Sequence, residues 1–106
     1  MAFVYLIGEI NNKNCYKIGI TKCKDINDRL KKLQTGNSSE LFIKAYYETD
    51  SPYKLEKMLH NHYYDKQILN EWYELENDDI KEFNNVCDKL QNNINSLIDN
   101  PFFIKN

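Results

Sequence analysis

Apolar and polar positions in the first twenty residues alternate in blocks that predict two β-strands. Residues 3–7 and 15–20 form apolar runs of strand length, and the segment between them, 8–14, is rich in turn-forming residues. This order is typical of a β-hairpin whose loop is longer than the two-residue type. Because alternate side chains of a strand share a face, Tyr5 and Lys17 can be held by buried neighbours while their polar ends reach the surface.

The apolar spacing after the hairpin changes to a helical period. Ile26, Leu30 and Leu33 recur at helical intervals and predict a helix from residue 24 or 25 to about 35, ending at Gly36. Arg29 lies at the edge of this apolar stripe, where its side chain can point toward the sheet. The alternative is a surface arginine whose aliphatic stem covers apolar atoms.

A third strand and a second helix follow. Residues 41–47 are mainly aromatic and aliphatic, which favours a strand. Ser51 and Pro52 suit the N-cap and the first position of a helix. On that helix Glu56 and His60 are four residues apart, so a carboxylate and an imidazole share one face. The alternative is a surface Glu–His pair of little energetic weight.

The C-terminal part of the chain predicts a short strand over 72–75 and a long amphipathic helix over about 78–99. The apolar residues of this helix follow the spacing of a heptad seam: Ile80, Phe83, Cys87, Leu90, Ile94 and Leu97. Such a seam has to be buried, either across the sheet or against the same helix of a second copy, so a homodimer is one expectation. We also expect the apolar tail 102–104 to dock on the protein.

Together these elements predict one domain over residues 1–106 of the α+β class. We expect a small central antiparallel three-stranded sheet flanked by helices, in the order β-β-α-β-α. This core covers about 3–75, and the C-terminal amphipathic helix is added to it.

Charge is unevenly distributed along the chain. The net charge is −2, which counts mildly against a protein that coats duplex DNA, because such proteins are usually basic. Acidic residues gather in 71–82, whereas basic residues crowd the first half. Four lysines around the first helix are candidates for phosphate contacts, the alternative being an ordinary solvated face: Lys22, Lys24, Lys31 and Lys32.

Other features of the sequence exclude several classes of protein. No stretch approaches the roughly 20 apolar residues that span a bilayer, and the N-terminus lacks the pattern of a secretory signal. We therefore expect a soluble, intracellular protein with no membrane partner. The three cysteines are scattered and odd in number, which predicts ordinary thiols rather than disulfides or a zinc site.

Polar residues on four different elements carry a resemblance to a known family. Val4-Tyr5-Leu6 and Lys17-Ile18-Gly19 resemble the two signatures of the GIY-YIG nuclease superfamily, in a Lys-Ile-Gly variant. The tripeptide around Arg29 and the segment 55–60 around Glu56 match the motifs that come next along the chain in this superfamily. Gly36-Asn37 and residues 71–75 resemble more specifically its small phage, viral and bacterial branch, often labelled a DNA-binding domain.

The resemblance implies a divalent-metal-dependent endonuclease that hydrolyses DNA phosphodiester bonds, with duplex DNA as the first candidate. Glu56 would hold the Mg²⁺ or Mn²⁺ ion. Tyr5 would act on the attacking water as general base or orienting group, with Lys17 as the cation that favours the ionised phenol. Arg29 would clamp the phosphate and stabilise the charge that develops in the transition state.

Departures from the family pattern keep a second interpretation open. The name-giving tyrosine of the second motif is replaced by Lys17, and a further family tyrosine, one turn after the arginine, corresponds to Leu33. That role is either unfilled or taken by His60 as a helper acid–base group; the alternative is a structural histidine. The second interpretation is a nucleic-acid-binding module of the same fold that is catalytically weak or inactive.

Overall fold

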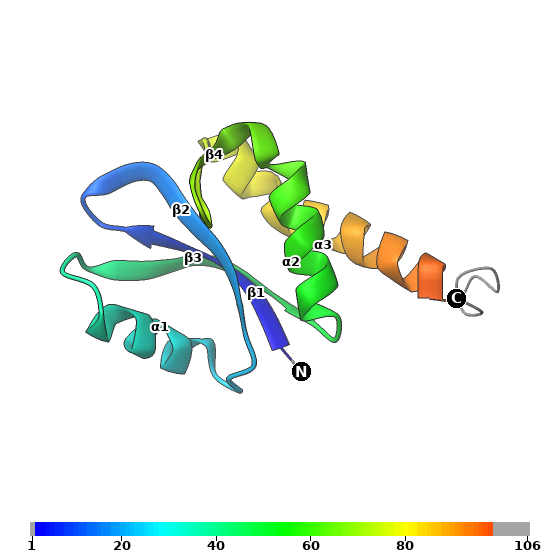
Figure 1. Cartoon of the computed structure of the whole chain (residues 1–106), viewed down its shortest axis with the longest axis horizontal. Helices are drawn as coiled ribbons and strands as arrows, with labels where there is room; N and C mark the ends of the chain where they lie inside the picture. The colour runs from blue at the N-terminus through cyan, green and yellow to red at the C-terminus, as the bar shows by residue number, and fades with distance from the viewer. Residues whose placement is uncertain (1, 99–106) are drawn as a thin grey trace.

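One antiparallel sheet supports the other elements of the fold (Figure 1). The computed structural model describes residues 2–98. Its strands are β1 (Ala2–Glu9), β2 (Asn12–Thr21), β3 (Leu41–Thr49), β4 (Gln67–Leu69) and β5 (Trp72–Glu74). Its helices are α1 (Ile26–Thr35), α2 (Pro52–His62) and α3 (Asn77–Ile98), with a short 3₁₀ turn, η1 (Tyr64–Lys66), after α2.

The sheet has five strands in the order β3-β1-β2-β5-β4, so the expected three-stranded sheet is wrong, although the α+β class holds. The short strand β5 pairs with β2 from Cys15 to Lys17, and β4 pairs with β5. All three residues of β4 are exposed. A strand of this length shows no alternation of apolar and polar residues, which is why the sequence pattern predicted a loop before β5.

The first hairpin is also tighter than expected. Its strands extend to Glu9 and from Asn12, so only two residues connect them, and the predicted loop over 8–14 is wrong. The pairing of β1 with β2 shifts register at Gly8/Glu9, and Asn14 has a positive φ of 64°. These two local irregularities let the strands stay paired up to the short connection. Asparagine tolerates this left-handed conformation better than most residues do.

Helices cover both faces of the sheet (Figure 1). α1 lies on one face, and α2 and α3 lie on the other. The smaller core, under α1, contains Tyr5, Ile7, Ile26 and Leu41. The larger core lies between the sheet, α2 and α3. Asp25, one of the two residues expected to open the helix, caps α1 through its side chain, whereas the side chain of Ser51, the predicted N-cap of α2, makes no capping hydrogen bond.

The heptad seam of α3 is buried within the chain itself, which is the first of its two predicted outcomes. Phe83, Cys87 and Ile94 belong to the larger core, whereas Leu97 stays 44% exposed. The homodimer through this helix stays a prediction, and residues 102–104 lie outside the described residues. None of the helices within residues 2–98 is long and apolar enough to cross a membrane.

Cys87 makes the stability of this core sensitive to alkaline pH. The three cysteines are free thiols, as predicted, and burial raises the pKa of the Cys87 thiol from 9.0 to about 12. The folded state thus keeps a proton that the unfolded chain releases, so stability is complete below about pH 9 and falls between about 9 and 12. Tyr47, whose pKa burial raises to about 12, adds to the upper part of this fall.

We therefore expect Cys87→Ala to reduce the pH dependence of the free energy of unfolding across this alkaline window. Urea unfolding curves at a series of pH values measure it. Cys23→Ala, which changes a partly exposed thiol, is the matched control and should keep the wild-type slope. An identical slope in wild type and Cys87→Ala would contradict the assignment.

Candidate active site

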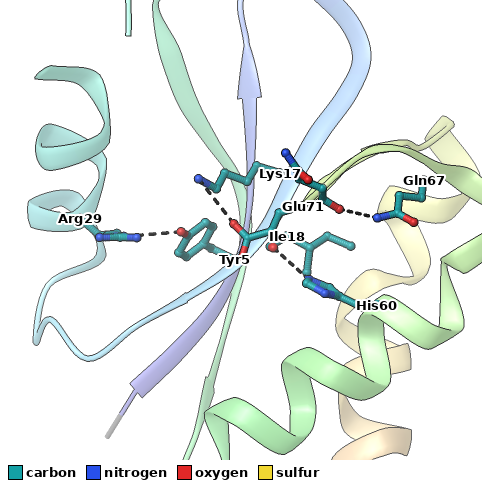
Figure 2. Close-up of polar contacts among 8 residues, drawn as sticks. Tyr5, Lys17, Ile18, Arg29, His60, Gln67 and Glu71 are labelled. Carbon is teal, nitrogen blue, oxygen red and sulfur yellow. Dashed lines mark hydrogen bonds and ion pairs between the residues drawn. The ribbon is translucent and has the colours of Figure 1, made fainter. Parts of the chain in front are cut away.

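The candidate active site begins where the pairing of β5 with β2 ends, opposite Lys17. The backbone of the next residue on β2, Ile18, makes hydrogen bonds to two other parts of the chain. Its N–H donates to the carbonyl oxygen of Glu71 at 3.0 Å. Its own carbonyl oxygen lies 3.2 Å from Nε2 of His60 (Figure 2). Since Glu71 follows β4 and His60 lies on α2, this edge of β2 brings both elements to one place.

Tyr5 is held beneath α1 with only 1% of its surface exposed. The Arg29 Nε donates to the Tyr5 hydroxyl oxygen at 3.5 Å, so Arg29 points toward the sheet (Figure 2). Burial raises the pKa of the Tyr5 phenol, and the hydrogen bond and charge of Arg29 oppose that rise. The phenol therefore keeps its proton at neutral pH.

Lys17 does not have the expected partner. The sequence favoured Lys17 as the cation beside Tyr5, but its Nζ pairs with the Glu71 carboxylate at 3.6 Å (Figure 2). Arg29 is instead the cation bonded to Tyr5. The expectation that Lys17 favours an ionised Tyr5 is thus not met, because the nearest carboxylate holds its ammonium group.

Glu71 is a site residue that sequence reasoning missed. It lies between β4 and β5, after Asn70, whose φ is 53° and whose carbonyl oxygen accepts from Gln67 Nε2 at 2.6 Å. Its carboxylate approaches Lys17 and helps to raise the pKa of both Tyr5 and Glu56. Glu71 begins the segment 71–75 that carries part of the family resemblance, but that resemblance gave it no role, and only the pairing of β5 with β2 brings its carboxylate here.

Glu56 and His60 come from α2, where they share a face as predicted. The Glu56 carboxylate is partly buried, and burial is the main cause that raises its pKa. The His60 charge lowers that pKa, Glu71 raises it and Lys17 lowers it. Glu56 therefore lies within electrostatic reach of three site residues. Among residues 2–98 it has no ion-pair partner.

The donors around Glu56 suit one kind of metal ion. The described part of the chain contains no group of three or more His, Cys, Asp or Glu residues able to hold a metal. What remains is one carboxylate at a polar site, with the Glu71 charge nearby. Mg²⁺ prefers oxygen ligands and keeps several waters, so a single carboxylate such as that of Glu56 is a donor that Mg²⁺ or Mn²⁺ would accept, whereas the described residues offer no set of several protein ligands of the kind that zinc uses.

The four candidate phosphate-binding lysines are all exposed, on α1 and the segment before it: Lys22, Lys24, Lys31 and Lys32. They lie on the same stretch of chain as Arg29. Lys22 lies over the ring of Tyr53, and Lys32 approaches the Cys23 sulfur at 3.7 Å. Leu33 packs against the core under α1, so an apolar contact occupies the position that corresponds to a family tyrosine.

Gly19 provides the space that Tyr5 needs. The two residues are cross-strand partners, and a Cβ at Gly19 would lie 2.5 Å from the Tyr5 hydroxyl oxygen and 2.7 Å from Cζ. We expect Gly19→Ala to displace the phenol and to destabilise the fold by about 1–3 kcal/mol, the usual cost of overpacking.

Gly36→Ala is the matched control for this prediction, because a Cβ at Gly36 meets nothing within 4 Å. Denaturant unfolding of the two variants and wild type measures the difference. Equal unfolding midpoints for Gly19→Ala and Gly36→Ala would show that the close packing of Gly19 and Tyr5 does not constrain the site.

The fold and the cluster together define a small α+β protein in which a phenol, two cations and two carboxylates gather beside β2, near the point where its pairing with β5 ends. The chain belongs to the T5orf172 domain family, whose model matches residues 2–88. This family is associated with a nuclease-related fold. Neither a curated protein nor a solved structure shows a significant match to the chain. The matched segment contains all the residues of the candidate site.

Proposed function

We propose that this protein is a divalent-metal-dependent endonuclease of the GIY-YIG type that hydrolyses DNA phosphodiester bonds. The observation that supports it most is the convergence of Tyr5, Lys17, Arg29 and Glu56 from four elements on one edge of β2. The packing of an apolar core gives no reason for such a gathering. Membership of a family with a nuclease-related fold agrees with this proposal.

Arg29 is the group best suited to hold the phosphate. Its Nε is bonded to Tyr5, which leaves the two terminal nitrogens of the guanidinium free to donate to two phosphate oxygens. Because the side chain is partly buried, its charge acts in a medium less polar than water. Arg29 would thus stabilise the negative charge that grows on the phosphate in the transition state.

Tyr5 would orient the attacking water or a phosphate oxygen, and would not act as the base that deprotonates the water. Its raised pKa keeps the phenol protonated, and its oxygen accepts from Arg29. The phenolic O–H is then left to donate within the site. His60 would assist as an acid–base group through Nδ1 when its Nε2 donates to the Ile18 carbonyl oxygen.

Glu56 would hold the metal ion beside the phosphate. Mg²⁺ or Mn²⁺ bound there would supply Lewis-acid stabilisation of the phosphate and of the leaving oxygen. Lys17 would place a second positive charge at the site, and Glu71 would keep its ammonium group in position. The exposed lysines of α1 and the segment before it would bind flanking phosphates of the DNA.

The alternative is a nucleic-acid-binding module of the same fold that does not cleave. It is favoured by the apolar packing of Leu33, which leaves a family tyrosine without a counterpart, and by the net charge of −2. Such a module would bind nucleic acid with an affinity that falls steeply with salt concentration, without metal-dependent strand breaks.

Incubation with end-labelled DNA separates the two functions. Purified protein is mixed with a labelled duplex or a labelled single strand, with Mg²⁺, with Mn²⁺ or with EDTA, and products are resolved on a denaturing gel. The proposal predicts shortened strands that require the metal. Intact DNA in every lane, together with salt-sensitive binding, would favour the binding module.

A further inference from the structure

An open hollow of about 520 Å³ lies where β2 leads toward α1 and α2 begins. It is lined by Ala2, Lys22, Thr49, Asp50, Pro52 and Tyr53. None of these residues belongs to the proposed catalytic set. The volume falls within the roughly 300–1,000 Å³ range of small-ligand sites, so it is large enough for one nucleotide unit.

Tyr53 and Lys22 are the two residues in the hollow that point to a ligand. The Tyr53 side chain is 63% exposed, although it is a large aromatic group. The Lys22 ammonium lies 5.2 Å from the centre of its ring, a cation–π contact that restrains both side chains. Sites for single-stranded nucleic acid use the same pair of groups, because a base stacks on the ring and a cation binds the backbone phosphate.

Two elements that line the hollow also carry residues of the candidate active site. On α2, Tyr53 precedes Glu56 by three residues, so the two side chains are neighbours on the helix surface, about 4.5 Å apart along its axis. On the sheet, Lys22 follows Thr21, which pairs with Phe3, two residues from Tyr5. A nucleotide in the hollow would therefore adjoin the one whose phosphate reaches Glu56 and Arg29.

The remaining polar groups favour a base in the hollow over a second phosphate. The Thr49 hydroxyl is already used, since it accepts from the Ser51 N–H and donates to Gln91 Oε1. The Asp50 carboxylate accepts one bond, from the Ser51 hydroxyl at 3.3 Å, and can accept another from the amino group of a base. Its negative charge would repel a phosphate.

We infer that this hollow binds an unpaired nucleotide next to the cleaved phosphate, with its base stacked on Tyr53 and its phosphate on Lys22. The nucleotide must be unpaired, because the faces of a base inside a duplex are covered by its neighbours. The substrate class is then DNA with a single-stranded segment at the cleavage point, such as an overhang or a displaced strand. The inference rests on the proposed function, since it requires a nucleic-acid ligand.

The test uses the full chain and a single-stranded DNA oligonucleotide that contains the fluorescent base 2-aminopurine, in EDTA so that the strand stays intact. Stacking on Tyr53 should quench the fluorescence. Tyr53→Ala should lose the quenching and bind about tenfold more weakly, within the range measured for base–aromatic stacking, whereas Tyr53→Phe should retain both. Tyr64→Ala is the matched control, because Tyr64 is 74% exposed and lies beyond the opposite end of α2.

The outcomes distinguish this inference from the proposed function. Wild-type quenching and affinity in Tyr53→Ala would overturn the inference alone. An equal loss in Tyr64→Ala would overturn it as well, since the effect would then not be specific to the hollow. A wild-type protein that binds neither this oligonucleotide nor its duplex would overturn the proposed function together with the inference.

Discussion

Glu56→Gln is expected to abolish metal-dependent DNA cleavage while it leaves the fold and DNA binding intact. The carboxylate is partly buried, has no ion-pair partner among the described residues and is the proposed metal ligand. Glutamine keeps the size of the side chain and removes its charge. Metal ions contribute several kcal/mol of transition-state stabilisation, so the cleavage rate should fall by at least about a thousandfold.

Glu40→Gln is the matched control for this variant. Glu40 is an exposed glutamate directly before β3, outside the candidate site. Single-turnover cleavage of a labelled oligonucleotide at saturating metal compares the two variants with wild type. Circular dichroism and an anisotropy titration confirm that the Glu56→Gln protein is folded and binds DNA. A Glu56→Gln protein that cleaves at the wild-type rate would remove Glu56 from the mechanism.

Arg29→Lys is expected to lower the cleavage rate by about 10²–10³-fold, the usual effect of removing one donor to the transition state. Arg29 is the chain's one arginine, beside 13 lysines. Its planar guanidinium can bond the Tyr5 hydroxyl and a phosphate at the same time. A lysine keeps the charge but cannot reproduce this fixed arrangement of donors.

Two readouts separate this role from simple attraction of DNA. Because Arg29→Lys preserves the charge, the salt dependence of DNA binding should match that of wild type while the rate falls. Lys24→Ala removes an exposed candidate phosphate contact and should show the opposite pattern, with weaker binding and a salt slope that is smaller by about one. Arg29→Lys with an unchanged rate would contradict the phosphate-clamp role.

The sequence predicts the elements that have a clear period. The helices α1 and α3 lie within a few residues of their predicted bounds, since each repeats apolar residues at helical spacing, and α2 begins at Pro52 as predicted. Of the two short strands, β5 confirms the strand predicted over 72–75, whereas β4 was not predicted, and the place of neither in the sheet could be derived from the sequence. Their position in the sheet depends on pairing between distant residues, as between Tyr16 and Tyr73, and not on a local pattern.

The candidate site follows the same division. Tyr5, Lys17, Arg29 and Glu56 could be named because each lies at a defined position of a predicted element. Glu71 could not, because a turn outside the periodic elements carries it to Lys17. The rise in the Tyr5 pKa could not be predicted from the sequence for a similar reason, since it depends on how deeply α1 and the sheet bury the phenol.

A time course of the wild-type protein on supercoiled plasmid DNA, with Mg²⁺ and with Mg²⁺ plus excess EDTA, tests the proposed nuclease activity most directly. A plasmid is a sensitive substrate, because a single broken strand anywhere in it relaxes the supercoils. We expect relaxed or linear DNA that accumulates with Mg²⁺ and is absent with EDTA. The nuclease would be contradicted, and a DNA-binding module left, if the plasmid stays supercoiled with Mg²⁺ and a single-stranded circular DNA incubated in parallel also stays intact, while a low-salt gel shift shows bound protein.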